Sequence, residues 1–313
     1  MPTNVLIRPE AMQEGLKLGS NFETGALPTL TSPGDLGPAC SAFDPSGGGQ
    51  LLDNLKLSIT PQRLQDRRYL LASLDSVMRQ VDEYDLLAGV DRFQQQAFEV
   101  ITRGIAQAFD LSQEDPATLA RYDTSKLFRM EDLQKYGDMR RSTNLLGRQM
   151  LLARRLCEAG CRFVTVSDCG WDMHANGNSP KQMAGLPMLA GQVDHAVSAF
   201  IDDLRERGLT DRILLAVTGE MGRTPRINNN GGRDHWGNLT SLCLAGGGWK
   251  MGQVIGQSDR QAGSPATDTY TPAHLLATVM HTLFDVTQLR LERGVPREIA
   301  RVVEEGSPIA ELA

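Results

Sequence analysis

The segment from Val164 to Trp236 alternates short apolar runs with one amphipathic helix, and this alternation restricts the fold more than any other feature of the chain. Residues 163–166 and 213–217 form short apolar runs of the kind that build buried strands. Residues 189–204, between them, carry apolar side chains at helical spacing. This order predicts a β-α-β unit and therefore an α/β fold.

Three polar clusters interrupt this apolar pattern, at residues 170–174, 219–225 and 232–236, just after predicted strands. In open α/β sheets, ligands bind beyond the carboxyl ends of the strands, so we expect the clusters to converge. Their carboxylates and imidazoles are suitable ligands for Zn, Mn, Mg or Ca. The predicted ligands of this divalent metal ion are Asp172, His174, Glu220, Asp234 and His235.

Each of these side chains also has a plain structural interpretation. Asp172 and His174 are two residues apart, and such a pair in a loop is more often a capping or salt-bridged pair than a pair of metal ligands. Glu220 could pair with Arg223 of the same loop. Arg223 and Arg233 could hold an anionic substrate, because a guanidinium matches two oxygens of phosphate or sulfate, or they could be solvated loop residues.

The composition excludes several classes of protein. With 313 residues and 41% hydrophobic content, the chain can bury a sizeable core. A net charge of −6 with scattered basic pairs argues against a nucleic-acid partner. No apolar run reaches the ~18 residues of a membrane span, and the first residues lack the zones of a signal peptide. The five cysteines have no metal-knuckle spacing, and we expect free thiols.

The chain is predicted to consist of a lead-in and one larger domain. Residues 1–58 are rich in Gly, Pro and Ser, which predicts irregular structure. Residues 59–313 are expected to form the α/β domain, with a mainly helical part at 59–160 and a part that holds the metal site at 161–313.

Apolar periodicity and capping signals set the expected elements within this domain. Helices are predicted over residues 60–82, 84–108 and 145–160, and from Pro116 and Thr271 onward. A third strand is predicted over residues 239–244, and a hairpin through 253–255 is predicted after the three glycines at 246–248.

The same motifs carry a resemblance to known proteins. Residues 192–220 resemble the helix-strand core of the sulfatases and alkaline phosphatases. More closely, the motifs at 163–166, 170–174, 219–225, 232–236, 244–248 and 252–256 resemble domain-of-unknown-function family 1501, from roughly Pro61 to the C-terminus. This resemblance implies an alkaline phosphatase-like fold, with a mixed, mostly parallel sheet flanked by helices. It also implies a bacterial protein that is periplasmic or exported, provided that a longer precursor supplies the signal.

The resemblance further implies roles for the candidate ligands. Asp172 and His174 would bind one metal, Glu220 would take the carboxylate place of the strand-end motif, and Asp234 with His235 would complete the set. Phosphatases and sulfatases have His where this chain has Met221, so we expect one metal ion instead of two.

The family's N-terminal features are not recognisable: an export signal, a first strand that ends in a metal-binding Asp, and a nucleophile. We therefore expect a C-terminal part of a longer protein or a reduced member, whose open sheet edge an upstream segment or a second copy of the chain would fill. The expected function is metal-dependent hydrolysis of a small phosphate or sulfate ester, with Arg223 and Arg233 binding the anion. The alternative is a non-catalytic metal-binding or structural protein without the nucleophile.

Overall fold

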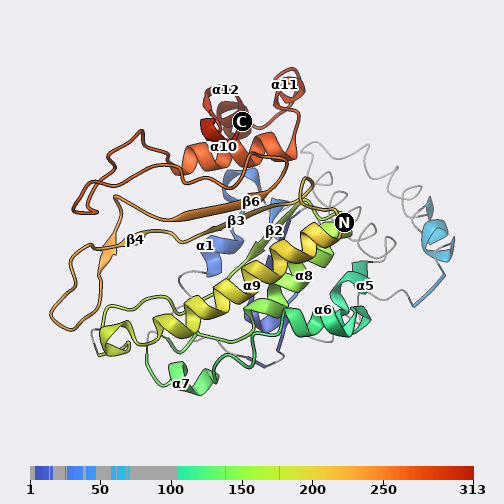
Figure 1. Ribbon diagram of the computed structural model, residues 1–313. Helices are drawn as coiled ribbons and strands as arrows, with labels where there is room; N and C mark the ends of the chain where they lie inside the picture. Colours follow the sequence, from blue (N-terminus) through green and yellow to red (C-terminus); the bar gives the residue numbers. More distant parts are fainter. Residues whose placement is uncertain are drawn as a thin grey trace. The chain divides into compact units, whose positions relative to one another are not determined.

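The computed structural model describes residues 4–13, 15–16, 25, 27–37, 40–46, 58–60, 62–67, 69–70, 105–137, 139–175 and 177–313 (Figure 1). The chain forms two compact units. The first unit comprises Met1–Phe128 and Thr143–Cys169, and the second comprises Arg129–Ser142 and Gly170–Ala313.

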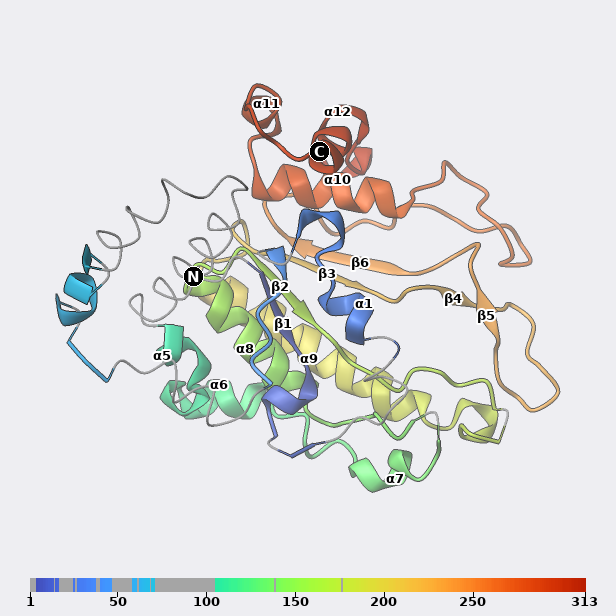
Figure 2. The same ribbon diagram turned by 180° about the vertical axis from the view of Figure 1, so that it is seen from behind.

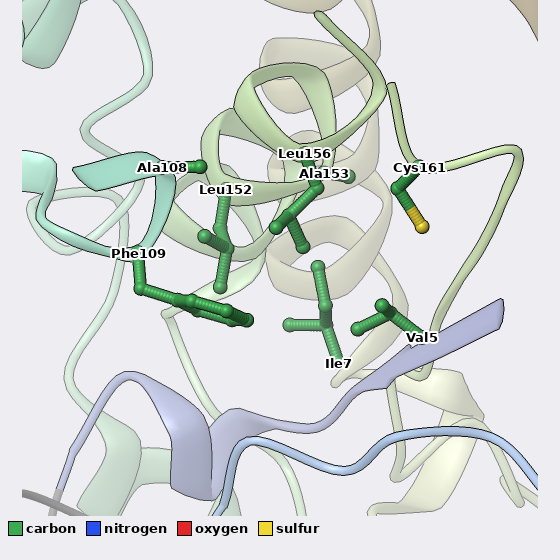
Figure 3. Close-up of a cluster of buried hydrophobic side chains, with 8 residues drawn as sticks. All are labelled: Val5, Ile7, Ala108, Phe109, Leu152, Ala153, Leu156 and Cys161. Carbon is green, nitrogen blue, oxygen red and sulfur yellow. The ribbon is translucent and has the colours of Figure 1, made fainter. Parts of the chain in front are cut away.

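A parallel pair of strands lies at the centre of the first unit. β1 (Asn4–Ile7) pairs with β2 (Phe163–Val166) in register from Asn4–Phe163 to Ile7–Val166. The β1 side chains of Val5 and Ile7 are fully buried, and helix α8 (Leu146–Glu158) covers them with Leu152 and Leu156. Figure 3 shows Ile7 of the strand pointing toward these leucines, with Phe109 beside Leu152.

The prediction that residues 1–58 are irregular throughout was wrong at β1, which is a regular strand. Its four-residue run is too short to stand out in a Gly- and Pro-rich segment, and its partner β2 lies far along the chain. Phe43 joins the same strand by accepting from Leu6 N–H and donating to Asn4 C=O, both over 2.9 Å. The lead-in thus supplies a strand and part of the first unit's core. Its short helices are η1 (Pro9–Ala11), α1 (Leu27–Thr31) and η3 (Gly34–Leu36).

The predicted helices of the first unit are confirmed where the structure describes them. Asp115 caps α6 (Pro116–Arg121) by accepting from Thr118 N–H over 3.0 Å, and α8 ends before Gly160, which has a φ of 100°. Residues 62–67 and 69–70 are helical, whereas the rest of the helix predicted to end near residue 82 lies outside the described residues. Of the helix predicted over 84–108, only the end is described, as α5 (Ile105–Phe109), and η5 (Leu111–Gln113) follows it.

The second unit is built around the long helix α9 (Leu186–Glu206) and two small antiparallel sheets. β3 (Leu214–Thr218) pairs with β6 (Leu242–Gly246), and Figures 1 and 2 both show them side by side. The second sheet pairs β4 (Gly222–Arg223) with β5 (His235–Trp236). The remaining helices are α7 (Met130–Gln134), η6 (Lys181–Met183), α10 (Pro272–Leu283), α11 (Val286–Leu289), α12 (Arg297–Glu305) and η7 (Ala310–Leu312).

The prediction of a mostly parallel sheet was wrong for the part of the chain that the structure describes. There, one strand pair is parallel and two are antiparallel, so the fold is a mixed α/β arrangement with small sheets. The expected β-α-β pairing is absent from these residues: β3 pairs with β6 and not with β2, because the chain returns antiparallel beside it.

Two further expectations about the C-terminal region have different outcomes. The predicted hairpin through residues 253–255 is not formed; Gly246, Gly247 and Gly248 all have positive φ and turn the chain away after β6. The helix predicted from Thr271 is confirmed as α10, whose first turn is closed by His274 Nδ1 accepting from Thr271 N–H over 3.0 Å.

Among the described helices, none combines the length and apolarity that a bilayer crossing demands. None of the five cysteines, all of which the structure describes, forms a disulfide, in agreement with the predicted thiols.

Candidate metal centre

Asp172 and His174 lie on an irregular loop of the second unit, and a glycine sets the backbone of this loop. Gly170 has a φ of 95°, and a Cβ atom there would lie 2.0 Å from Ser142 Oγ, so a larger residue would both strain the backbone and collide. The turn at Gly170 brings the two side chains together: His174 Nε2 lies 2.7 Å from Asp172 Oδ1.

His235 joins this pair from a different part of the chain. Its Nε2 atom lies 2.8 Å from the same Asp172 oxygen, and the rings of His174 and His235 have centroids 4.5 Å apart. One ligand atom from each of the three residues lies within 4.8 Å of the others, close enough to hold one metal ion. We call Asp172, His174 and His235 the triad.

The short β4–β5 hairpin aligns His235 with Arg223. The two residues are direct cross-strand partners, so their side chains lie next to each other on the hairpin. Gly222 permits the tight packing of this hairpin, since a Cβ atom there would lie 2.0 Å from Leu239 O. Trp236, the partner of Gly222, is half-buried and donates from Nε1 to Gly263 O over 2.9 Å.

Arg223 supplies fixed positive charge at the triad. Its Nη2 atom donates to Asp172 Oδ1 over 2.9 Å and to Trp171 O over 3.0 Å, and its Nη1 atom lies 3.5 Å from His174 Nε2. Burial opposes ionisation of Asp172, but hydrogen bonds from His235 and Arg223 outweigh it and hold the pKa of this carboxyl below its usual value. Asp172 is therefore a carboxylate, the form that binds cations.

Asp234 is not a member of the triad, but it contacts the triad residue His174. Its Oδ1 atom lies 3.2 Å from His174 Nδ1, on the ring edge opposite to the one that faces Asp172. Asn228 also reaches this carboxylate, over 3.3 Å, and donates to His174 O over 2.8 Å. Asn228 was not among the predicted site residues; its only signal was its place in the turn Asn-Asn-Asn-Gly-Gly, where Asn commonly bonds nearby backbone.

Two other predicted site residues are not members of the triad. Glu220 is exposed after β3, and it is not a member of the ligand group. The pairing of Glu220 with Arg223 that the sequence left open gives way to the pairing of Arg223 with Asp172. Arg233 donates to Thr224 O and Pro225 O over 2.9 and 3.1 Å, which closes its own loop instead of facing the triad.

A model of the family described as "Protein of unknown function (DUF1501)" matches residues 2–312. The chain belongs to the DUF1501 family. The match includes the lead-in, which the sequence analysis had placed outside the resemblance. Neither a curated protein nor a solved structure matches this DUF1501 chain.

The geometry of this DUF1501 centre defines what it can do chemically. Two imidazoles and one carboxylate are a ligand set that zinc and neighbouring transition metals accept, and catalytic zinc sites typically have three protein ligands and one open position. The side chains of His235 and Asp172 are 47% and 38% exposed, so solvent and small molecules can reach the triad. Arg223 adds a donor for an anion beside it.

Proposed function

We propose that this chain is a hydrolase of phosphate or sulfate esters that uses one divalent metal ion. The triad would hold the metal, and a small anionic ester would be the substrate. Within this proposal the fold is a divergent relative of the alkaline phosphatase and sulfatase folds, and the protein acts outside the cytoplasm. One observation supports the hydrolase proposal most strongly: three ligand atoms lie together beside the guanidinium of Arg223.

The proposed mechanism assigns a task to each of these side chains. A divalent cation held by the triad would supply a Lewis acid and would lower the pKa of a water molecule, and such a reaction would not require a side-chain nucleophile. Asp172, His174 and His235 hold the cation. Arg223 donates to the oxygens of the ester and stabilises the negative charge that grows on them in the transition state. With Nε2 of His174 on the cation, the remaining ring proton would lie on Nδ1, which is 3.2 Å from Asp234 Oδ1.

The test measures metal uptake and turnover on the same protein. We expect His174→Ala and His235→Ala to lose stoichiometric zinc or manganese, and to lose hydrolysis of 4-nitrophenyl phosphate or 4-nitrophenyl sulfate with it. His281→Ala is the matched control, because His281 is exposed on α10 and is not a member of the triad. Stoichiometric metal in both triad variants would refute the assignment of the ligands.

A non-catalytic metal-binding or structural protein is the second candidate. One observation favours it: Asp172 Oδ1 already lies within hydrogen-bond distance of His174, His235 and Arg223, so the cluster is a connected polar network by itself. This candidate predicts that the wild-type chain turns over neither ester, even with Zn, Mn or Ca added. Turnover that depends on the triad would decide for the hydrolase.

A further inference from the structure

Arg223 already uses the hydrogen-bond donors that an anion needs. Its Nη2 atom donates to Asp172 Oδ1 over 2.9 Å and to Trp171 O over 3.0 Å, which accounts for both N–H groups of this nitrogen. A guanidinium binds phosphate or sulfate best through two parallel N–H groups, and both of the edges that offer such a pair include Nη2. An anion can therefore bind Arg223 in this way only when Nη2 gives up one of its two short hydrogen bonds.

Oδ1 of Asp172 contacts three nitrogen atoms at once. It lies 2.7 Å from His174 Nε2, 2.8 Å from His235 Nε2 and 2.9 Å from Arg223 Nη2. A carboxylate oxygen has about two lone-pair sites, so it cannot keep all three contacts and bind a cation as well. In a tetrahedral zinc site the ligand atoms are about 3.3 Å apart, so the imidazoles must move away from Oδ1 to share a cation with it. Nη2 of Arg223 then competes with the cation for this oxygen.

The charges act in the same direction as these contacts. A divalent cation on Asp172 repels the guanidinium beside it, which frees Nη2 for an anion. An anion on Arg223 in turn neutralises the positive charge that opposes the cation. By thermodynamic linkage, the cation and the anion each raise the affinity for the other by the same factor.

We propose that Asp172 keeps Nη2 of Arg223 from anions until a cation occupies the triad, so that the metal ion and the anionic substrate bind together. This proposal rests on the metal site and the substrate class of the proposed function. It adds a coupling between the two ligands, and it assigns this coupling to Arg223. Both ligands can be measured by binding alone, without turnover.

The first test measures anion binding to protein that a chelating resin has freed of metal. Inorganic phosphate is titrated by calorimetry. We expect Asp172→Asn to bind phosphate about tenfold more tightly than the wild type, because a neutral amide holds the guanidinium less strongly than a carboxylate does. The double variant Asp172→Asn with Arg223→Met should lose this gain. Wild-type protein that binds phosphate as tightly as Asp172→Asn overturns the proposal.

Asp234→Asn is the matched control for Asp172→Asn. It removes the same charge from a carboxylate that contacts His174 and Asn228. We expect this variant to bind phosphate like the wild type. An equal gain in both variants overturns the proposal, since the loss of negative charge would then explain the gain.

The second test measures zinc affinity by competition with a chelator, with and without inorganic phosphate at matched ionic strength. We expect phosphate to raise the zinc affinity of the wild type by about tenfold, and to have no such effect on Arg223→Met. Arg226→Met, a variant of an exposed arginine in the same loop, should respond like the wild type. This test changes no triad residue, so it decides the question even when Asp172→Asn does not fold. An equal response of the wild type and Arg223→Met overturns the proposal.

The outcomes separate this coupling from the function. Zinc binding that phosphate does not strengthen overturns the coupling alone. Coupled binding of zinc and phosphate without ester turnover refutes the hydrolase alone. Wild-type protein that binds no zinc refutes the metal site, and the coupling with it.

Discussion

Nη2 of Arg223 donates to Oδ1 of Asp172 over 2.9 Å, so a permanent positive charge lies against one of the three proposed metal ligands. This arrangement has opposing effects on a cation and on an anion at the same place. The guanidinium repels a bound metal ion and attracts an anionic substrate.

Arg223→Met should separate these two effects. Without the positive charge, we expect zinc affinity to rise by about 30-fold, which corresponds to a unit charge about 4 Å from a divalent ion in a medium as polar as water. Turnover of the ester should fall by about 100-fold, because a donor to the transition state is lost. Chelator competition and steady-state kinetics measure the two quantities, with Arg226→Met, an exposed arginine of the same loop, as control. A lower zinc affinity would instead indicate that Arg223 mainly positions Asp172.

Gly232→Ala should disrupt the site through the backbone. The added Cβ atom would lie 2.2 Å from His174 O, and the loop must move to relieve the clash. We expect a loss of about 1–3 kcal/mol in the free energy of unfolding, measured with urea, together with weaker zinc binding. Gly237→Ala is the control, since a Cβ atom there has no neighbour within 4 Å. Equal stability of the two variants would contradict the close packing of this loop.

The cysteines should differ strongly in their reactivity. Burial raises the pKa of the Cys157 thiol to about 12, so at pH 8 only about one molecule in ten thousand carries the reactive thiolate. Burial also raises the pKa of Cys161. Cys40 and Cys243 are exposed, and we expect iodoacetamide to modify them first. Peptide mass spectrometry over time measures the rates, and a Cys157 as fast as Cys243 would be inconsistent with its burial.

Glu114→Ala should destabilise the first unit. Glu114 accepts from Arg154 over 2.6 Å and from Arg155 over 2.7 Å, and the side chain of Arg154 is only 1% exposed. Removal of the carboxylate leaves a buried guanidinium with less compensation, and we expect a loss of about 3 kcal/mol in the free energy of unfolding. Lys126→Ala, which breaks an ion pair of an 84% exposed lysine, should have little effect. Similar denaturation midpoints for both variants would refute the importance of this pair.

Features encoded by neighbouring residues could be predicted from the sequence. Asp115 before Pro116 and Thr271 before Pro272 marked the starts of α6 and α10, since capping depends on residues three or four positions apart. β1 was missed because its stability comes from pairing with β2 and from burial under α8, neither of which its four residues reveal. The antiparallel partner of β3 was missed because an apolar run does not specify strand direction.

The residues of the candidate site were likewise predicted only in part. Asp172, His174 and His235 were predicted as ligands, and the structure brings their ligand atoms together. Glu220 also followed a predicted strand, but its side chain is exposed and is not a member of this ligand group. Asn228 was missed, because its contacts with His174 and Asp234 depend on how a glycine-rich turn closes.

The hydrogen bond between His235 and Asp172 joins positions 63 residues apart, with α9 and β3 lying between them in the chain. A metal ion shared by these two side chains would be a reversible cross-link that closes this long segment into a ring. A covalent cross-link of that span removes enough entropy from the unfolded chain to stabilise the folded state by about 4 kcal/mol. For the second unit, the metal would thus be comparable to a disulfide that a chelator can open.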